Sequence, residues 1–388
     1  MYDFDSGVER KGTNCIKWDV PFVKEKEDVL PMWIADMDFR VAPAITENLT
    51  KISRQGAFGY QLLSENYYKS VMSWMERRHG YHLEREEICF VPNVVVGLAY
   101  AVQTIANPGD EIIVQTPAYG HFFGVVKDND CKVVESKLKN EQGYYTMDLE
   151  DLENKITEKT KAVIICNPHN PSGRVWSEKE LRDLAEICVK HDLYILSDDI
   201  HSELIMKGNK HTFISLLSEE VRKRCFIFTS PSKAFNLAGI HLANCFIADE
   251  NLRKKFMEQK AKFHAGENSS FVEAALTGAY DESEDWLNEV TEYIDGNLEY
   301  FVQEIHKHMP ELTVYKPEGT YLVWVDFRKT SIEPEKLQQY LLNECKIVAN
   351  PGEFFGKGGE GFARFNLACP RSTVVEAVNR LKSKFANK

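Results

Sequence analysis

Short apolar, β-branched runs recur through the centre of the chain, and their spacing constrains the fold more than any other feature. Five such runs occupy residues 111–117, 161–168, 193–199, 225–232 and 242–248. Between the second and third, Ser177 and Glu180 match a helix capping box, and apolar residues follow at helical spacing. Strand, helix and parallel strand in this order form a βαβ unit, whose strands are buried on both faces. The sequence therefore predicts an α/β protein of the doubly wound class.

Polar, turn-forming segments follow four of the predicted strands. They lie at residues 116–119, 167–170, 197–201 and 230–233. Another strand is predicted to end at Val91 and to lead through Pro92 and Asn93 into a helix, whose first N–H groups are suited to bind a phosphate. Because ligands bind outside the carboxyl ends of the strands in doubly wound sheets, we expect the site at this edge.

The pattern changes near residue 286, where a long amphipathic helix is predicted, followed by strand-like segments. A chain of 388 residues is long enough for two domains. We predict a large cofactor-binding domain over residues 45–285. Residues 1–44 and 286–388 are expected to form a smaller α+β domain beside it.

Composition excludes several classes of protein. No run approaches the roughly 18 apolar residues of a membrane span, and the N-terminus has no basic stretch followed by an apolar core. The net charge is −12, with no dense basic block, which argues against a nucleic-acid partner. The nine cysteines form no C-x-x-C pair. We expect reduced thiols in a cytoplasmic protein that acts on a small molecule.

Lys233 is the first candidate for chemistry. It follows a predicted buried strand in the apolar stretch FIFTSPSKAFNLAG. Such surroundings disfavour the ammonium form and favour the neutral amine that condenses with an aldehyde cofactor. A surface lysine is the ordinary alternative. The S-x-x-K spacing also occurs in penicillin-binding enzymes, but their K-T-G partner is absent here.

A run of acids and a histidine follows the preceding strand. Asp198 is placed to hold the ring nitrogen of a pyridine cofactor protonated. Alternatively, Asp198, Asp199, His201 and Glu203 are the acid-rich start of a helix, or donors to a metal ion. The metal reading lacks a second histidine at helical spacing, so we predict no metal site.

Three further side chains are candidates, each with an ordinary alternative. Tyr119 could stack on a planar cofactor or simply pack in the core. Asn170 lies between two prolines and offers an amide to a phenolic oxygen. Arg364 could bind a substrate carboxylate with two N–H groups, or form a surface ion pair. The G-x-G-x-x-G spacing at 356–361 neither follows a strand nor opens a helix, so we predict a loop there.

These segments together resemble a known family. NPHNPSGRVW (167–176), SDDIH (197–201) and SPSKAFNLAG (230–239) are similar to the fold-type I pyridoxal-phosphate enzymes of aminotransferase class I/II. PMWIADMDF (31–39) narrows the resemblance to the MalY/PatB-type cystathionine β-lyases, or carbon–sulfur lyases. The resemblance implies a large domain with a mostly parallel seven-stranded sheet flanked by helices, and pyridoxal 5′-phosphate as cofactor.

The resemblance also implies roles for the matched residues around the cofactor ring. Lys233 is expected to bind the cofactor aldehyde covalently and to be the catalytic residue. Asp198 is expected to pair with the pyridine nitrogen, Asn170 with the phenolic oxygen, and Tyr119 to stack on the ring. His201 is expected near the phenolic oxygen, where many aminotransferases have tyrosine.

Phosphate and substrate contacts follow from the same resemblance. The expected phosphate contacts are the backbone N–H groups and hydroxyls of Val94, Val95, Ser230 and Ser232. Tyr60 is expected to reach the phosphate of a neighbouring subunit, which implies a homodimer with shared sites. The residues expected to contact substrate are Arg364, Asn170, Ala35 and Tyr119.

Two positions depart from the family pattern. His241 stands where aminotransferases place an arginine on the phosphate, which weakens the transaminase case. Asp199 stands where glutamate is expected. The predicted function is β-elimination of cystathionine and related S-substituted L-cysteines to a thiol, pyruvate and ammonia. The alternatives are an aminotransferase, a regulatory protein that retains the fold, and a metal-dependent hydrolase.

Overall fold

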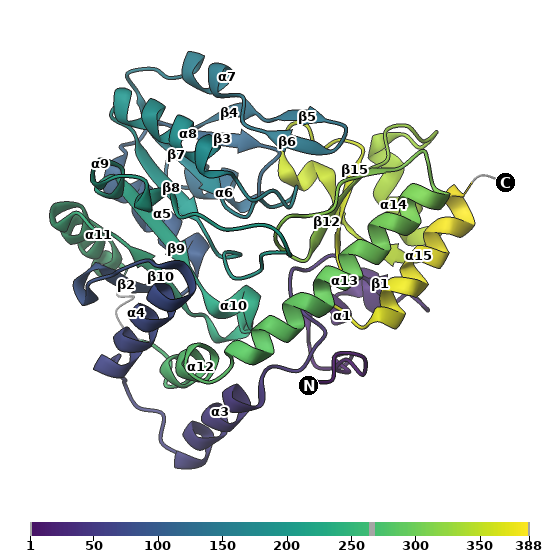
Figure 1. The fold of residues 1–388 in the computed structure, drawn as a ribbon, viewed down its shortest axis with the longest axis horizontal. Helices are drawn as coiled ribbons and strands as arrows, with labels where there is room; N and C mark the ends of the chain where they lie inside the picture. Colours follow the sequence, from purple (N-terminus) through teal and green to yellow (C-terminus); the bar gives the residue numbers. More distant parts are fainter. Residues whose placement is uncertain (1, 264–267, 387–388) are drawn as a thin grey trace.

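The computed structural model describes residues 2–263 and 268–386, and the larger of its two parts is built around a seven-stranded sheet (Figure 1). The strand order is β2-β10-β9-β8-β7-β3-β4. These strands are β2 (Ile88–Val91), β10 (Ala243–Phe246), β9 (Cys225–Thr229), β8 (Tyr194–Asp198), β7 (Thr160–Cys166), β3 (Glu111–Thr116) and β4 (Lys132–Lys137). The pairs among β9, β8, β7, β3 and β4 are parallel, and β10 is antiparallel to both of its neighbours. The predicted α/β class and the mostly parallel sheet are confirmed.

Helices cover both faces of this sheet. Along β8 and β9, side chains alternate between two buried clusters: Ile195 and Ile227 face one, and Leu196 and Phe226 the other. The helices around the sheet are α3 (Pro43–Gln55), α4 (Glu65–His79), α5 (Val94–Ile105), α6 (His121–Lys127), α8 (Glu178–Lys190), α11 (Glu250–Lys262) and α12 (Phe271–Tyr280). Burial on both faces explains why these strands are continuous apolar runs in the sequence. The capping box of Ser177 and Glu180 begins α8 as predicted.

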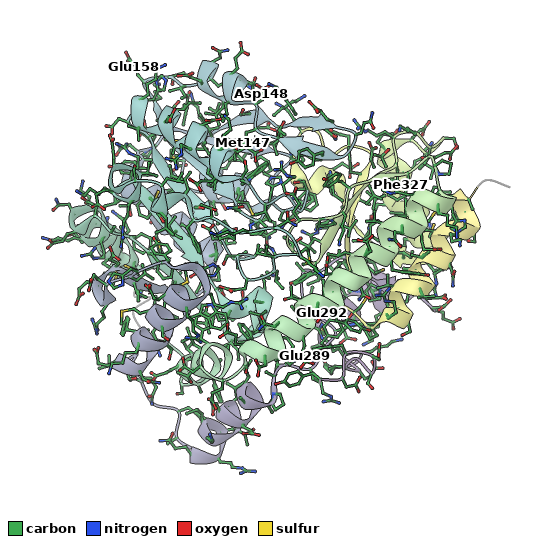
Figure 2. All side chains as sticks on the ribbon, in the orientation of Figure 1. Met147, Asp148, Glu158, Glu289, Glu292 and Phe327 are labelled. Atoms are coloured by element: carbon green, nitrogen blue, oxygen red, sulfur yellow. The ribbon has the colours of Figure 1, made fainter. Side chains whose placement is uncertain are left out.

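A second sheet lies toward the C-terminus. Its order is β11-β12-β15-β14, and it is antiparallel throughout. Its strands and main helices are β11 (Thr313–Val314), β12 (Leu322–Asp326), β15 (Phe362–Asn366), β14 (Asn350–Pro351), α13 (Glu284–His308) and α15 (Arg371–Phe385). In Figure 1, α13 extends from beside α12 to α15. Phe327, labelled in Figure 2, is buried and packs against Phe365 and Phe385.

The remaining elements are short. They are α1 (Ile16–Asp19), α2 (Pro21–Lys24), β1 (Leu30–Pro31), β5 (Lys139–Glu141), β6 (Tyr144–Thr146), α7 (Leu149–Asn154), α9 (Glu219–Arg222), α10 (Pro231–Ala234), α14 (Leu337–Asn343) and β13 (Ile347–Val348). Turns, and not a helix, follow β8, so the reading of Asp198–Glu203 as an acid-rich helix start is wrong. Residues 356–361 form turns before β15, as predicted. Over the described ranges, no helix combines the length and apolarity that a bilayer crossing requires.

The N-terminal segment 31–39 passes between the two sheets. Asn236, just after α10, donates to the carbonyls of Met37 and Phe39 and accepts from the Met37 N–H. Asn366, at the end of β15, donates to the carbonyls of Ile34 and Asp36. These two amides attach the segment to both parts of the molecule, and its backbone thereby reaches the edge where the parallel strands end.

Candidate active site

The polar strand ends open into a cavity of about 510 Å³. Every predicted site residue except Tyr60 lines it: Ala35, Val94, Val95, Tyr119, Asn170, Asp198, His201, Ser230, Ser232, Lys233 and Arg364. The register explains this convergence, because Cys166, Asp198 and Phe228 stand side by side on β7, β8 and β9. The loops that follow these residues therefore leave the sheet at the same edge (Figure 1).

Lys233 lies on the single turn of α10 that follows β9. Its Nζ donates a 2.9 Å hydrogen bond to the carbonyl of Ala35, in the segment 31–39. Burial lowers the pKa of this amine to about 8, and the nearby Arg364 guanidinium contributes to the decrease. The neutral amine that a nucleophile or general base requires is therefore more populated near neutral pH than it is for an exposed lysine.

Asp198 ends β8 and is buried, with 4% of its surface exposed. Its carboxylate accepts one hydrogen bond, from the Ile200 N–H at 3.2 Å. Burial raises its pKa to about 7, and the negative charge of Asp199 adds to the increase. No basic side chain of the described residues forms an ion pair with it. The site thus holds a carboxylate that gains stability from a cationic ligand group.

Arg364, on β15, is also buried, at 2% exposure. Its two terminal nitrogens donate to Asn170 Oδ1 at 2.9 Å and to the Trp33 carbonyl at 2.8 Å. Its Nε has no hydrogen-bond partner, and burial lowers its pKa to about 10. No acidic side chain in the described parts of the chain pairs with it, so the alternative of a surface ion pair is wrong. A buried guanidinium without a counter-charge is suited to an anionic ligand.

The start of α5 provides a second place for an anion. Asn93 caps the helix by accepting from the Val96 N–H at 2.9 Å. The N–H groups of Val94 and Val95 precede the first intrahelical bond and face no acceptor among the described residues. Ser232 lines the same cavity. The Ser230 hydroxyl, by contrast, donates to the Leu242 carbonyl at 2.5 Å, so its proton is already bonded.

Aromatic rings form one wall of the cavity. The Tyr119 ring lies 5.0 Å from His121 and 6.0 Å from Phe354 between centroids. His201 is buried with its Nδ1 unpartnered, and its ring lies 6.0 Å from Tyr321. Burial, with Lys233 and Arg364 nearby, lowers the pKa of His201 well below its ordinary value. His201 is therefore a neutral ligand for an oxygen or a hydroxyl.

Sequence reasoning missed several residues that shape this site. The Tyr321 hydroxyl donates to the same Ala35 carbonyl that Lys233 contacts, at 2.9 Å. Trp33, His121 and Phe354 line the cavity. Trp33 belongs to the motif 31–39, so it could have been predicted from the sequence. His121 begins α6, two residues after Tyr119, and so belongs to the loop that follows β3. Tyr321 and Phe354 lie on segments without a distinguishing pattern, and only the packing of the second sheet against the first brings them here.

The donor set fits pyridoxal phosphate. The cavity offers an amine for the aldehyde, a carboxylate for the ring nitrogen, an amide and a neutral histidine for the phenolic oxygen, and free N–H groups for the phosphate. Each of these groups is buried or partly buried, and several have no partner among the residues that the structure describes. The described residues contain no group of three or more His, Cys, Asp or Glu arranged to hold a metal ion.

Comparisons with known proteins agree with this geometry. Residues 28–381 match the family model described as aminotransferase class I and II. The chain is 38% identical to cystathionine beta-lyase PatB of Bacillus subtilis, over 98% of this chain and 99% of the relative. It is 32% identical to a cystathionine beta-lyase of Corynebacterium glutamicum, over 97% and 98%.

Solved structures are equally similar over the whole length. Cystalysin from Treponema denticola, which contains pyridoxal 5′-phosphate, superposes with a TM-score of 0.95 at 34% identity, covering 99% of this chain and 98% of cystalysin. The pyridoxal-phosphate-bound C–S lyase of Staphylococcus hominis gives 0.92 at 30% identity, covering 100% and 99%.

Proposed function

This chain belongs to the aminotransferase class I and II family, and we propose that within it the chain works as a pyridoxal-phosphate-dependent carbon–sulfur lyase. It cleaves cystathionine and related S-substituted L-cysteines by β-elimination. Water enters the overall reaction, and the products are a thiol, pyruvate and ammonia. From cystathionine the thiol is homocysteine.

One observation carries the proposal for the site. Arg364, a buried guanidinium without an acidic partner, lines the same cavity as Lys233, an amine whose pKa is lowered to about 8. An amino acid bound through its carboxylate at Arg364 is thereby held beside a basic amine. The relatives' names support sulfur-containing amino acids as the substrate class.

The groups that would hold the cofactor follow from the donor set. Lys233 would hold the aldehyde carbon, and Asp198 the ring nitrogen in its protonated form. Asn170 would donate its amide to the phenolic oxygen, beside the neutral His201. The N–H groups of Val94 and Val95, together with Ser232, would bind the phosphate, and the Tyr119 ring would cover one face.

Bound pyridoxal phosphate supplies an electron sink that acidifies the Cα–H bond of an attached amino acid and lets a β-substituent leave. The chain's residues provide orientation and proton transfer. Arg364 donates to the substrate carboxylate through N–H groups that Asn170 and the Trp33 carbonyl hold in place. Once the substrate's amino group has replaced it at the aldehyde carbon, the freed Lys233 amine would take the proton from Cα, and burial favours the neutral form that this needs. Asp198 would keep the proton at the ring nitrogen.

The aromatic wall borders the place where the cofactor and substrate would bind. Tyr119, His121 and Phe354 pack around one another at the cavity wall, and Trp33 lies on the segment that Arg364 contacts. Asp198 and Arg364 are themselves buried, which strengthens their contacts with ligands, because buried charges are poorly screened.

We also propose a homodimer with shared sites. Tyr60 is 89% exposed and Leu62 92%, while Phe58, 59% exposed, stacks on Phe271. Large apolar side chains gathered on an exposed segment mark an interaction surface. Tyr60 would reach the phosphate in the neighbouring subunit's cavity. Light scattering should give the mass of two chains, and Tyr60→Phe should weaken cofactor binding; a monomer with full cofactor affinity contradicts this.

The test of function compares two reactions of the purified protein. Cystathionine alone should yield pyruvate, homocysteine and ammonia, without any oxo-acid acceptor. An aminotransferase uses the same amine, carboxylate and guanidinium, but needs 2-oxoglutarate or another oxo acid to turn over. Turnover that depends strictly on an oxo acid, with no pyruvate from cystathionine alone, would refute the lyase proposal.

Two further expectations remain proposals. A cytoplasmic location is supported by the cysteines, all nine of which are free thiols; cell fractionation tests it. Domain boundaries near residues 45 and 285 are supported by the positions of the two sheets, since β2 to β10 precede α13 and β11 to β15 follow it. Limited proteolysis that cuts near those positions supports the boundaries, and cuts within either sheet contradict them.

A further inference from the structure

Asp199 and His211 form a buried pair behind the carboxylate expected to face the cofactor. Their side chains are 0% and 1% exposed, and His211 Nε2 lies 3.1 Å from Asp199 Oδ1. Apart from this contact, neither carboxylate oxygen of Asp199 has a hydrogen-bond partner among the described residues. An isolated buried carboxylate is strongly unfavourable, and His211 is the ionisable side chain that lies against it in the described chain.

The position of Asp199 ties this pair to the active site. Asp199 directly follows Asp198, and its N–H donates to the carbonyl of Phe228, the residue beside Asp198 on β9. Burial raises the pKa of Asp198 to about 7, and the charge of Asp199 adds to that increase. The geometry and the charge of Asp199 are therefore both transmitted to Asp198.

The groups around the pair come from several elements. The His211 ring lies 6.0 Å from His79 of α4 and 4.5 Å from Phe213. The thiols of Cys166 on β7 and Cys225 on β9 are neutral, because burial raises the pKa of both. The nearby charge of Asp199 makes a smaller contribution in the same direction.

A second cavity, of about 550 Å³, reaches the pair from outside. His211 lines it with His79, Arg78, Glu203 and the exposed Lys210. Glu203 is already bonded to His79 at 2.7 Å and to the Trp74 indole at 2.8 Å. Charged side chains of this cavity other than His211 have no ion pair with Asp199 in the described chain.

We propose that Asp199 and His211 are positioning residues that act through Asp198 on the bound cofactor. The pair holds the first peptide after β8 in place and balances the charge next to Asp198, so that Asp198 keeps its contact with the ring nitrogen. This inference rests on the role of Asp198 in the proposed function. It assigns a use to the second acid of the SDDIH segment and to a histidine ten residues from His201.

The experiment compares Asp199→Asn, His211→Asn and the double variant with the cofactor-bound wild type. Lys210→Ala is the matched control, because Lys210 lines the same cavity without contacting Asp199. The measurements are the dissociation constant of pyridoxal phosphate, the pH midpoint of the bound cofactor's absorption change, and kcat and KM separately. Thermal unfolding checks that each variant is folded.

Each single variant should weaken cofactor binding about tenfold, shift the spectral midpoint, and lower kcat with little change in KM. The double variant should bind pyridoxal phosphate no more weakly than the weaker-binding single variant, since either substitution already removes the contact between Asp199 and His211. Asp199→Glu, which keeps a carboxylate for His211, should stay near the wild type. Lys210→Ala should change none of these values.

Variants that lose stability alone, with cofactor affinity, spectral midpoint and kcat equal to those of the control, overturn the proposal. Asp198→Asn separates this failure from a failure of the proposed function. If Asp198→Asn leaves cofactor affinity and spectrum unchanged, both the ring-nitrogen role and the pair's action through it are wrong. If Asp198→Asn perturbs them and the pair's variants do not, only the pair's role is wrong.

Discussion

Two cavities of similar volume border the segment around the end of β8, and the charged side chains that line them are arranged differently. In the cavity that contains Lys233, neither Arg364 nor Asp198 forms an ion pair with a side chain of the described residues. In the cavity beside α4, Glu203 is bonded to His79 and Trp74. Unpaired buried charges cost stability unless a ligand completes them, whereas paired ones stabilise the fold. The contrast favours the first cavity as the ligand site that we propose.

Substitutions should separate the two cavities by what they damage. In the Lys233 cavity, loss of a charged group should reduce catalysis and leave the fold intact. In the cavity beside α4, loss of Glu203 should reduce stability and leave chemistry nearly intact. The Asp199–His211 pair lies between these cases, because it lines the second cavity through His211 and adjoins Asp198.

Lys233→Ala should have the largest effect. Removing the amine eliminates the general base, which contributes roughly a hundredfold to ten-thousandfold, and also the covalent attachment of the cofactor. We expect pyruvate formation from cystathionine to fall by about a thousandfold or more, while thermal unfolding stays close to the wild type. Activity at the wild-type level would refute the role of Lys233, and it would also refute the proposed difference between the two cavities.

Asp198→Asn should change how the stability of the cofactor-free protein depends on pH. The folded-state pKa of Asp198 is raised to about 7, so its protonated form is favoured on folding. This contribution is fully present below the unfolded pKa and is lost as pH rises through about 7. Relative to that of Asp198→Asn, the free energy of unfolding of the wild type should fall by up to about 4 kcal/mol as the pH rises from 4 to 7.

Denaturant unfolding at several pH values measures this difference. A difference between the two proteins that does not vary over this range would show that Asp198 is not held in a charge-disfavouring environment. The cavity would then lack the unpaired carboxylate on which its contrast with the second cavity depends.

Arg364→Lys should weaken the use of substrate about a hundredfold in kcat/KM, because an ammonium cannot reproduce the planar two-pronged contact with a carboxylate. Most of the loss should be in KM if Arg364 binds substrate and transition state alike. Steady-state kinetics with cystathionine tests this. An unchanged KM would place the substrate carboxylate elsewhere.

Glu203→Gln should have the smallest effect on catalysis and act on stability instead. Although burial opposes ionisation, His79, Trp74 and Arg78 lower the pKa of Glu203. Its stabilisation is therefore present above the unfolded pKa and lost as pH falls through the lower folded value. We expect Glu203→Gln to lower the free energy of unfolding by about 2 kcal/mol at neutral pH and by less in acid. Its kcat should stay within a few-fold of the wild-type value. A catalytic loss as large as that of Arg364→Lys would erase the distinction between the cavities.

The fold was largely predictable because its signals are local. Each strand of the large sheet that was singled out is a short apolar run, and Ser177 with Glu180 marks the start of α8. Lys233 and Asp198 were predictable for the same reason: each stands directly after such a strand. Their roles also drew on the resemblance, since S-x-x-K and a pair of acids are common in other settings.

Other features of the site were not predictable from local pattern. Tyr321 and Lys233 donate to the same Ala35 carbonyl from segments far apart in the chain. The amides of Asn236 and Asn366 hold segment 31–39 in place, yet neither residue stands out in its sequence. The Ser230 hydroxyl, expected on the phosphate, donates to Leu242, a carbonyl that β10 brings close.

The sequence by itself determined the α/β class, the strands and the chemical types gathered at their ends, because apolar periodicity and turn chemistry act over a few neighbouring residues. Only the tertiary structure decided which charges remain unpaired. Whether Arg364 meets an acid, whether Asp199 meets His211, and how far burial shifts Lys233 toward the neutral amine all depend on distances between segments and on exclusion of water. Those quantities arise only when both sheets and the N-terminal segment are packed together.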